Sequence, residues 1–326
     1  MEEYPIKTKV VGVDISNELT TFAIVDIRGN ILAEDSFDTS DFPDVNNFVK
    51  ELSDRIVNLV EANGGYEAIR SIGVSSPSAS SVSGCIENAA NLPWKGVVPL
   101  SAMLRDRVGL AVGLSNDAHI SALGEYTFGC AHGMKTFIIL NVGVGLGSCF
   151  FSAGDEHQGH HGYAGEFGHT CVVNHGRKCG CGHEGCLEAY VGAVGIVNTA
   201  KELMDASDKP SLMRGLEKLS PRTIKVCCDE GDEMAIEVFR RTGEMLGLGL
   251  ANYASIVDPE AVILTGGISH AGKWLLEPTV DSFDRHVFGN LRGKVKILVS
   301  KLNDRERDVL GASALAWSVP EYSLFK

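Results

Sequence analysis

Three cysteines and a histidine near the middle of the chain have the clearest chemical potential in this sequence. Cys179, Cys181 and Cys186 lie in one short stretch, and His169 precedes the first of them by ten positions. One imidazole and three thiolates form a typical donor set for structural zinc, and the intervening glycines allow a tight loop that points the sulfurs inward. We therefore predict a closed zinc site, which is not catalytic because four protein ligands leave no open position.

Other side chains nearby could take the place of one of these zinc ligands. His175 and His183 lie close enough in sequence to replace one ligand, and the three thiols could also be unliganded groups on a loop. The opening residues MEEYPIKTKV lack the basic and apolar segments of a signal peptide, so we expect a cytoplasmic protein. Metal binding is then favoured over disulfides. The other six cysteines, among them Cys227 and Cys228, are expected to be small buried hydrophobic residues.

A pair of polar residues follows a short apolar segment further upstream. Asn116 and Asp117 stand where a strand should end and a helix begin, which is the usual ligand edge of an open α/β sheet. Asp117 could act as a general base toward a hydroxyl, although Asn and Asp are also common helix caps. Glu166, His169 and Glu188 add donors and acceptors suited to neighbouring hydroxyls. Together these residues suggest a polyol ligand.

Composition restricts the class of protein. The chain has 326 residues with 44% hydrophobic and 22% charged residues, which is typical of a globular protein of about two domains. No apolar run approaches the roughly 18 residues of a membrane helix. The net charge of −13, without a basic patch, disfavours direct binding of nucleic acid.

Two sets of alternating strands and helices must position these residues. For the first set we expect a helix over 45–60 and strands over 9–14, 21–26, 31–37, 69–75 and 110–114. For the second set we expect strands over 136–142 and 262–264 and helices over 194–205, 221–230 and 232–256. The predicted domains are 1–117 and 118–326, with a C-terminal helix over about 308–318 packing back on the first. Ligands are expected in the cleft between the two domains.

Five motifs give the chain a resemblance to a known family over nearly its whole length. They are NLPW (91–94), SNDAHISALGE (115–125), GYAGEFGHTCV (162–172), CGCGHEGCLEAY (179–190) and LTGGIS (264–269). These segments resemble the ROK family of repressors, open reading frames and sugar kinases. The resemblance implies a two-domain actin-like ATPase fold of the ribonuclease H-like, hexokinase type. ROK kinases transfer the ATP γ-phosphate to a hexose or an N-acetylated amino sugar, and family members are commonly homodimers or tetramers.

The resemblance also implies residue roles. Asp117 takes the place of the catalytic base, and the implied zinc ligands are His169, Cys179, Cys181 and Cys186. The implied sugar contacts are Asn91, Asn116, Asp117, Glu166, His169 and Glu188. His169 would bind the metal through one ring nitrogen and the sugar through the other, which couples the zinc site to the pocket.

The first phosphate-binding hairpin departs from the kinase pattern. Family kinases continue from the position of Asp14 as x-Gly-Gly-Thr-Lys, but here Asp14 is followed by Ile-Ser-Asn-Glu-Leu. Side chains at Ser16 and Asn17 would occupy space that glycine leaves for a phosphate, and Glu18 adds a negative charge. Ser16 or Thr20 could replace the missing hydroxyl if the hairpin is shifted by one residue.

The second phosphate loop departs less. The kinase sequence Gly-Thr-Gly-x-Gly is Gly143-Val144-Gly145-Leu146-Gly147 here, so backbone donors are retained but the threonine hydroxyl is lost. If a nucleotide binds, we expect it at Asp14, Ser16, Gly143, Val144 and Gly145. Gly266 and Gly267 would then border its adenosine.

Both departures resemble the repressor branch of the family. We therefore predict a repressor-like sugar sensor that binds a hexose or amino sugar, and only about nine residues precede the first strand, too few for a DNA-binding domain. The alternative is an ATP-dependent hexose or N-acetylhexosamine kinase, similar to glucokinase, which would use ATP and magnesium with Asp117 as base. A third hypothesis is a structural or interaction protein with a vestigial pocket.

Overall fold

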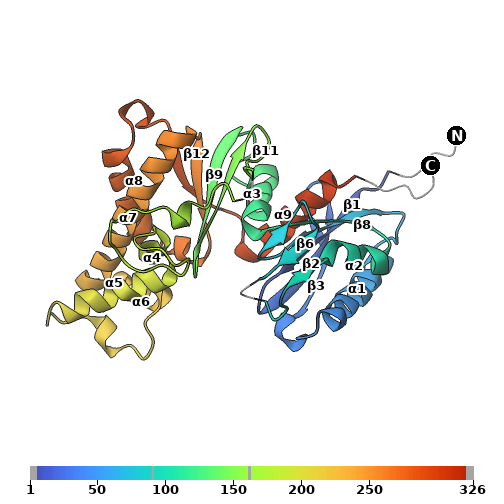
Figure 1. Ribbon diagram of the computed structural model, residues 1–326, viewed down its shortest axis with the longest axis horizontal. Coiled ribbons are helices and arrows are strands. Elements are labelled where there is room, and N and C mark those ends of the chain that lie inside the picture. Colours follow the sequence, from blue (N-terminus) through green and yellow to red (C-terminus); the bar gives the residue numbers. More distant parts are fainter. Residues whose placement is uncertain (1–5, 90–91, 161–162, 321–326) are drawn as a thin grey trace. The chain divides into compact units, whose positions relative to one another are not determined.

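The computed structural model describes residues 6–89, 92–160 and 163–320, and the chain forms two compact units (Figure 1). The first unit combines residues 1–132 with 302–326, and the second comprises residues 133–301. Both are α/β units built on a mixed five-stranded sheet, as the actin-like fold requires. No helix in the described part of the chain has both the length and the apolarity needed to cross a membrane.

The sheet of the first unit has the strand order β3-β2-β1-β4-β8. Its first three strands form an antiparallel meander, and β4 and β8 continue the sheet parallel to β1. The strands are β1 (Lys9–Ile15), β2 (Leu19–Asp26), β3 (Ile31–Asp38), β4 (Ile69–Ser75) and β8 (Ala111–Ser115). The five strands expected in this part of the sequence are therefore all present. A small separate sheet contains β5 (Ala79–Ser80), β6 (Cys85–Glu87) and β7 (Val97–Val98).

Helices cover both faces of this sheet. Val11 and Val13 of β1 pack in one core with α1 (Val45–Ala62) and α2 (Leu100–Val108), whereas Val10 packs in another with α9 (Asp304–Ser318). The alternation follows from the two-residue period of a strand. Helix α1 begins at the N-cap Asp44, whose side chain accepts from two backbone N–H groups of the first turn.

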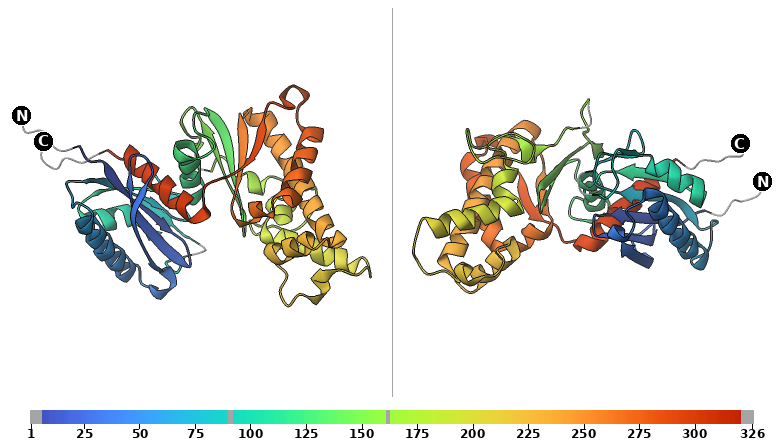
Figure 2. Two further views of the ribbon diagram at one scale, coloured as in Figure 1. Left: turned by 180° about the vertical axis from the view of Figure 1, so that it is seen from behind. Right: turned by 60° about the horizontal axis from the view of Figure 1, so that its bottom comes forward.

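Helix α9 packs tightly on the sheet, against β1 and β4 (Figure 2). Gly12 and Gly73 lie directly under it, and a methyl group at either position would overlap the backbone carbonyl oxygen of Val309 or Ala312. The Ser71 hydroxyl also donates to the Ala316 carbonyl at 2.6 Å. These glycines therefore permit a close approach between helix and sheet.

The boundary between the units differs from the predicted one. Helix α3 (Asp117–Phe128) belongs to the first unit, so the chain passes to the second unit after His132 and not at residue 117. The reason is packing between α3 and α9, where Gly124 lies against the Arg307 carbonyl and Gly311. That close contact cannot be read from the local sequence.

The second unit has the strand order β11-β10-β9-β12-β13. The strands are β9 (Thr136–Val142), β10 (Leu146–Ser152), β11 (Asp155–Glu156), β12 (Ala261–Thr265) and β13 (Lys296–Val299). The helices are α4 (Glu188–Val191), α5 (Ala193–Asp205), α6 (Pro221–Asp229), α7 (Glu233–Val257) and α8 (Lys273–His286). The three helices expected here correspond to α5, α6 and α7, whereas α8 and β13 were not anticipated.

Candidate functional site

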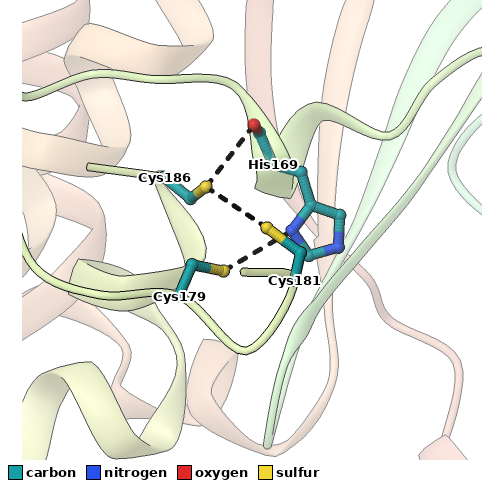
Figure 3. A group of neighbouring side chains, drawn as sticks. All are labelled: His169, Cys179, Cys181 and Cys186. Atoms are coloured by element: carbon teal, nitrogen blue, oxygen red, sulfur yellow. Dashed lines mark hydrogen bonds between the residues drawn. The ribbon is translucent and has the colours of Figure 1, made fainter. Parts of the chain in front are cut away.

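The four predicted metal ligands lie together in the second unit (Figure 3). One ligand atom from each of His169, Cys179, Cys181 and Cys186 lies within 4.8 Å of the others. The Cys179 sulfur is 3.7 Å from His169 Nδ1, and the Cys181 and Cys186 sulfurs are 3.7 Å apart. One nitrogen and three sulfurs fit the preference of zinc. Among the described residues, this group includes neither of the alternative histidines.

Protonation and metal binding are linked at this group. Burial raises the pKa of the Cys186 thiol to about 12, which keeps it protonated in the absence of a metal. A bound cation has to displace that proton, because only the thiolate is a good ligand. Metal binding at this donor set would therefore release a proton and would depend on pH.

Arg177 fastens the cysteine loop to α5. Its guanidinium donates to the Gly195 carbonyl at 3.0 Å, to the Thr199 hydroxyl at 2.9 Å and to the Glu202 carboxylate at 2.6 Å. It also lies over the Tyr190 ring, 4.8 Å from the ring centre. Part of the loop is thus held by protein contacts that need no metal.

Of the three predicted sugar contacts in the second unit, His169 belongs to the cysteine group and Glu166 and Glu188 lie beside it. Glu166 and His169 are exposed neighbours on one turn, with 4.0 Å between Glu166 Oε2 and His169 Nε2. Glu188 begins α4, and its Oε2 accepts the Leu146 N–H at 2.9 Å, while Oε1 lies 3.6 Å from the Cys179 sulfur. The carboxylate of Glu188 therefore joins the cysteine loop to the β9–β10 loop. Asn91, the predicted sugar contact in the NLPW motif, lies outside the described residues.

Asn116 and Asp117 stand at the start of α3 in the first unit. Asn116 is the N-cap and accepts the His119 N–H at 2.8 Å, so the capping interpretation applies to Asn116. Asp117 is exposed, and its carboxylate accepts the Ala118 N–H at 2.9 Å. The protein around Asp117 removes part of its hydration and raises its pKa, and the charge of Asp308 raises the pKa further. Asp117 is thus an accessible carboxylate with increased affinity for a proton, as a general base requires.

Asp14 is a second carboxylate with a raised pKa in the first unit. It lies near the end of β1, where burial and then the charge of Asp308 raise its pKa to about 7. Asp308 itself accepts the Ser121 hydroxyl at 3.0 Å and the buried Arg307 guanidinium at 3.1 Å. Sequence reasoning expected the helix that carries Asp308 but missed this role. The adjacent Arg307-Asp308 pair at a helix start was the available signal.

The β1–β2 hairpin is closed by its own hydrogen bonds. The Ser16 hydroxyl donates to the Leu19 carbonyl at 2.8 Å and accepts the Leu19 N–H at 3.1 Å. Thr20 is fully buried and hydrogen bonds to Thr39 at 2.8 Å, so its hydroxyl does not replace the missing one. Ser16 is thus engaged in a turn, and Asn17 and Glu18 are exposed at the tip.

A pocket of about 680 Å³ lies in the second unit next to the β9–β10 loop. This volume is within the range of small-molecule sites. Three predicted nucleotide contacts line it: Gly143, Val144 and Gly267. Sequence reasoning missed the rest of the lining: Ala193, Ser220, Pro221, Arg222, Lys225, Phe239, Ile268, His270 and Ala271. The pocket combines an apolar wall with cationic groups, which suits a flat ring attached to an anion.

Two predicted glycines have other surroundings. The α-carbon of Gly145 faces Glu188, so that a side chain there would meet the carboxylate. Gly266 has a φ of +83° and lies against Asn141, which leaves no room for a side chain. Gly266 therefore shapes the bend after β12, and neither of these glycines lines the pocket.

The two α/β units, each built on a mixed five-stranded sheet, define the class of fold. The chain belongs to the ROK family, whose family model matches residues 10–319. The family resemblance and the fold class inferred from the sequence are thereby confirmed.

Relatives of known activity fall in both branches of the family. The chain is 32% identical to a glucokinase of Streptomyces coelicolor over 94% of its own length and 96% of the relative. It is 31% identical to a glucokinase of Thermotoga maritima, over 95% and 97% of the two chains. A xylose repressor of Caldicellulosiruptor bescii is 29% identical, over 96% of this chain and 80% of the repressor.

Two solved structures share the fold of this chain. A ROK family glucokinase from Streptomyces griseus, in complex with glucose and AMPPNP, matches with a TM-score of 0.77 and 30% identity, over 95% of this chain and 99% of the other. A ROK family transcriptional regulator, a homologue of the Escherichia coli Mlc protein, matches with a TM-score of 0.84 and 22% identity, over 95% and 79%. The second likeness is one of fold alone.

Proposed function

We propose that the chain is an ATP-dependent sugar kinase acting on glucose or a related hexose. In the sequence-based predictions this function is the alternative, and a repressor-like sugar sensor is the main prediction. The observation that carries the proposal is the pocket beside Gly143 and Gly267 with Arg222 and Lys225 in its lining. A kinase requires a site that holds its nucleotide. The extent of the similarity to two glucokinases supports the same function.

In this proposal a sugar hydroxyl attacks the γ-phosphorus of ATP, and Asp117 accepts the proton of that hydroxyl. The hydroxyl oxygen forms a bond to the γ-phosphorus as the bond to ADP breaks and ADP leaves. Glu166, His169 and Glu188 hold the other hydroxyls, since carboxylates and imidazole are suited to orienting a polyol. Backbone N–H groups of the loop 143–147 and the cations at Arg222 and Lys225 balance phosphate charge.

Two ions complete the proposed site. His169, Cys179, Cys181 and Cys186 would hold zinc, which would fix the loop that carries His169 and would take no part in the chemistry. Magnesium, when bound with ATP, supplies positive charge for the transferred phosphoryl group.

One observation favours the second candidate, a sugar-binding regulator domain. The β1–β2 hairpin lacks the turn glycines, threonine and lysine of family kinases, and Ser16 closes the turn onto Leu19. If the chain were a kinase, its hairpin would have to bind the phosphates of ATP without these groups. Loss of one transition-state donor typically costs about 3–4 kcal/mol. A regulator would tolerate that loss.

Coupled measurement of ADP release distinguishes the two candidates. Purified protein is mixed with ATP, magnesium and glucose, mannose, xylose or N-acetylglucosamine, alongside Asp117→Asn and the control Asp106→Asn. Asp106 is an exposed carboxylate on α2 that pairs only with Arg105 among the described contacts. We expect hexose-dependent ADP release that falls at least about a thousandfold in D117N and is unchanged in D106N.

Calorimetric titration of the same sugars without ATP completes this experiment. Sugar binding without ADP release would reject the kinase and leave the regulator. If no sugar binds and no ADP is released, both functions are wrong and the pocket is vestigial.

A further inference from the structure

The turn that carries Glu166 and His169 has little internal support. It runs from Gly165, at φ +91°, through the single 3-10 turn Phe167–His169. Its own bonds are few and local. The Phe167 N–H donates to the Gly165 carbonyl at 2.7 Å, the His169 N–H to the Glu166 carbonyl and the Thr170 N–H to the Phe167 carbonyl at 3.2 Å each, and the Thr170 hydroxyl to the Phe167 carbonyl at 2.8 Å. A single such turn is not stable by itself, so its conformation depends on contacts from other elements.

Tyr253 of α7 supports the turn from one element. Its ring stacks on Phe167, with 4.1 Å between ring centres and 17° between planes. Its hydroxyl donates to the Phe167 carbonyl and lies 2.7 Å from the Thr170 hydroxyl. Tyr253 is 2% exposed, and burial raises its pKa to about 12, so the hydroxyl keeps its proton at neutral pH.

Ser148 of β10 supports the turn from another element. Its hydroxyl donates to the Gly165 carbonyl and accepts the Phe167 N–H at 3.1 Å. The N–H and the carbonyl of Phe167 are therefore bound by two side chains that lie far apart in the sequence. These bonds hold the backbone of the turn that carries the exposed residues Glu166 and His169.

We propose that the hydroxyls of Ser148 and Tyr253 form a clamp that holds Glu166 and His169 in the geometry required for sugar binding. Both are positioning residues, because neither reaches the exposed side of the turn. The inference rests on the proposed function only in that Glu166 and His169 contact the sugar. It assigns a role in ligand affinity to two residues that the motifs of the family resemblance do not contain.

The expected effect follows from the number of bonds removed. Tyr253→Phe keeps the ring stacked on Phe167 and deletes one hydroxyl, and Ser148→Ala deletes the other. The net contribution of one such bond corresponds to about a three- to tenfold change in an equilibrium constant. We expect each variant to weaken glucose binding by about that factor and the double variant by about ten- to a hundredfold, because independent free-energy losses add.

The experiment measures glucose binding by calorimetry without ATP, together with zinc content, melting temperature and steady-state kinetics. We expect the glucose Kd and KM to rise, while kcat at saturating glucose, the KM for ATP and one zinc per chain are retained. Matched controls are Ser255→Ala, whose hydroxyl donates to Ala251 within α7, and Tyr66→Phe in the first unit. Both controls should bind glucose as the wild type does.

Several results separate this inference from the proposed function. An unchanged glucose Kd in Y253F and S148A would overturn the clamp even if the protein is an active kinase. A fall in kcat, zinc content and melting temperature together would also overturn it, because that pattern indicates general destabilisation. If the wild type binds glucose without ADP release, the kinase is rejected, and the Kd values still decide on the clamp. Failure of every sugar to bind rejects both.

Discussion

Replacing Asp308 by asparagine should change how stability and activity depend on pH. The amide side chain would keep the shape of the carboxylate and an oxygen that accepts from Ser121, but it removes one negative charge. That charge raises the pKa of both Asp14 and Asp117. The variant also leaves Arg307 with one carboxylate fewer beside it, which lowers the pKa of Asp14 further.

The magnitude can be worked from Asp14. Its pKa of about 7 in the folded chain exceeds the ordinary value of 3.8, so the folded state binds a proton that the unfolded state releases between these values. The contribution of Asp14 to the free energy of unfolding is therefore fully present below about pH 4. It is lost as the pH rises through 7, and the total loss is about 4 kcal/mol. Burial accounts for the largest share of this rise in pKa, and the negative charge of Asp308 accounts for the next largest.

Urea unfolding from pH 4 to pH 8 tests this reasoning. D308N should lose measurably less stability than the wild type over that interval, as a part of the total of about 4 kcal/mol. In the kinase assay, the acid limb of kcat/KM should move to lower pH, because Asp117 would lose its proton more readily. The exposed control D106N should leave both profiles unchanged. The reasoning is refuted if D308N folds and its two profiles coincide with those of the wild type.

Other predictions concern the loop and the core. Protein purified without chelator should contain one zinc per chain by mass spectrometry, and Cys181→Ala should lower the zinc content and weaken sugar binding; unchanged sugar affinity would contradict the coupling. Gly73→Ala should lower the free energy of unfolding by about 2 kcal/mol or more, because the methyl group meets the Ala312 carbonyl under α9, and an unaltered urea midpoint would disprove this contact. Glu188→Ala should raise the KM for ATP as well as for sugar, since Glu188 binds the Leu146 N–H, whereas Glu188→Gln should largely preserve the KM for ATP. A change in the sugar KM alone would argue against the bridge.

The sequence predicted most strands and helices because their patterns are local. The β-branched run at β1 and the helical spacing of Phe48, Leu52 and Ile56 need no distant information. Helix α8 was missed because it contains Pro278, which usually interrupts a helix. The domain boundary was misplaced because the side on which α3 packs depends on α9, which lies far along the chain.

The candidate site was predictable to a similar extent. Ligand types and spacing brought His169 and Cys179 to one group, and the structure places them there. Arg222 and Lys225 could not be assigned to a pocket, since that depends on how α6 packs beside the β9–β10 loop. The charged pair Arg307-Asp308 is visible in the sequence, but the role of Asp308 is not, because Asp14 and Asp117 are distant in sequence and approach it only in the folded unit.

The position of α9 has a consequence for biosynthesis. Residues 133–301 form a unit of their own, whereas the first unit needs a helix from residues 304–318 to cover the face of its sheet at Gly12 and Gly73. During translation, the inserted unit can therefore fold first while that face stays open on the ribosome. The amino-terminal segment therefore exposes an apolar surface until residues 304–318 have been synthesised, and exposed surfaces of this kind promote aggregation.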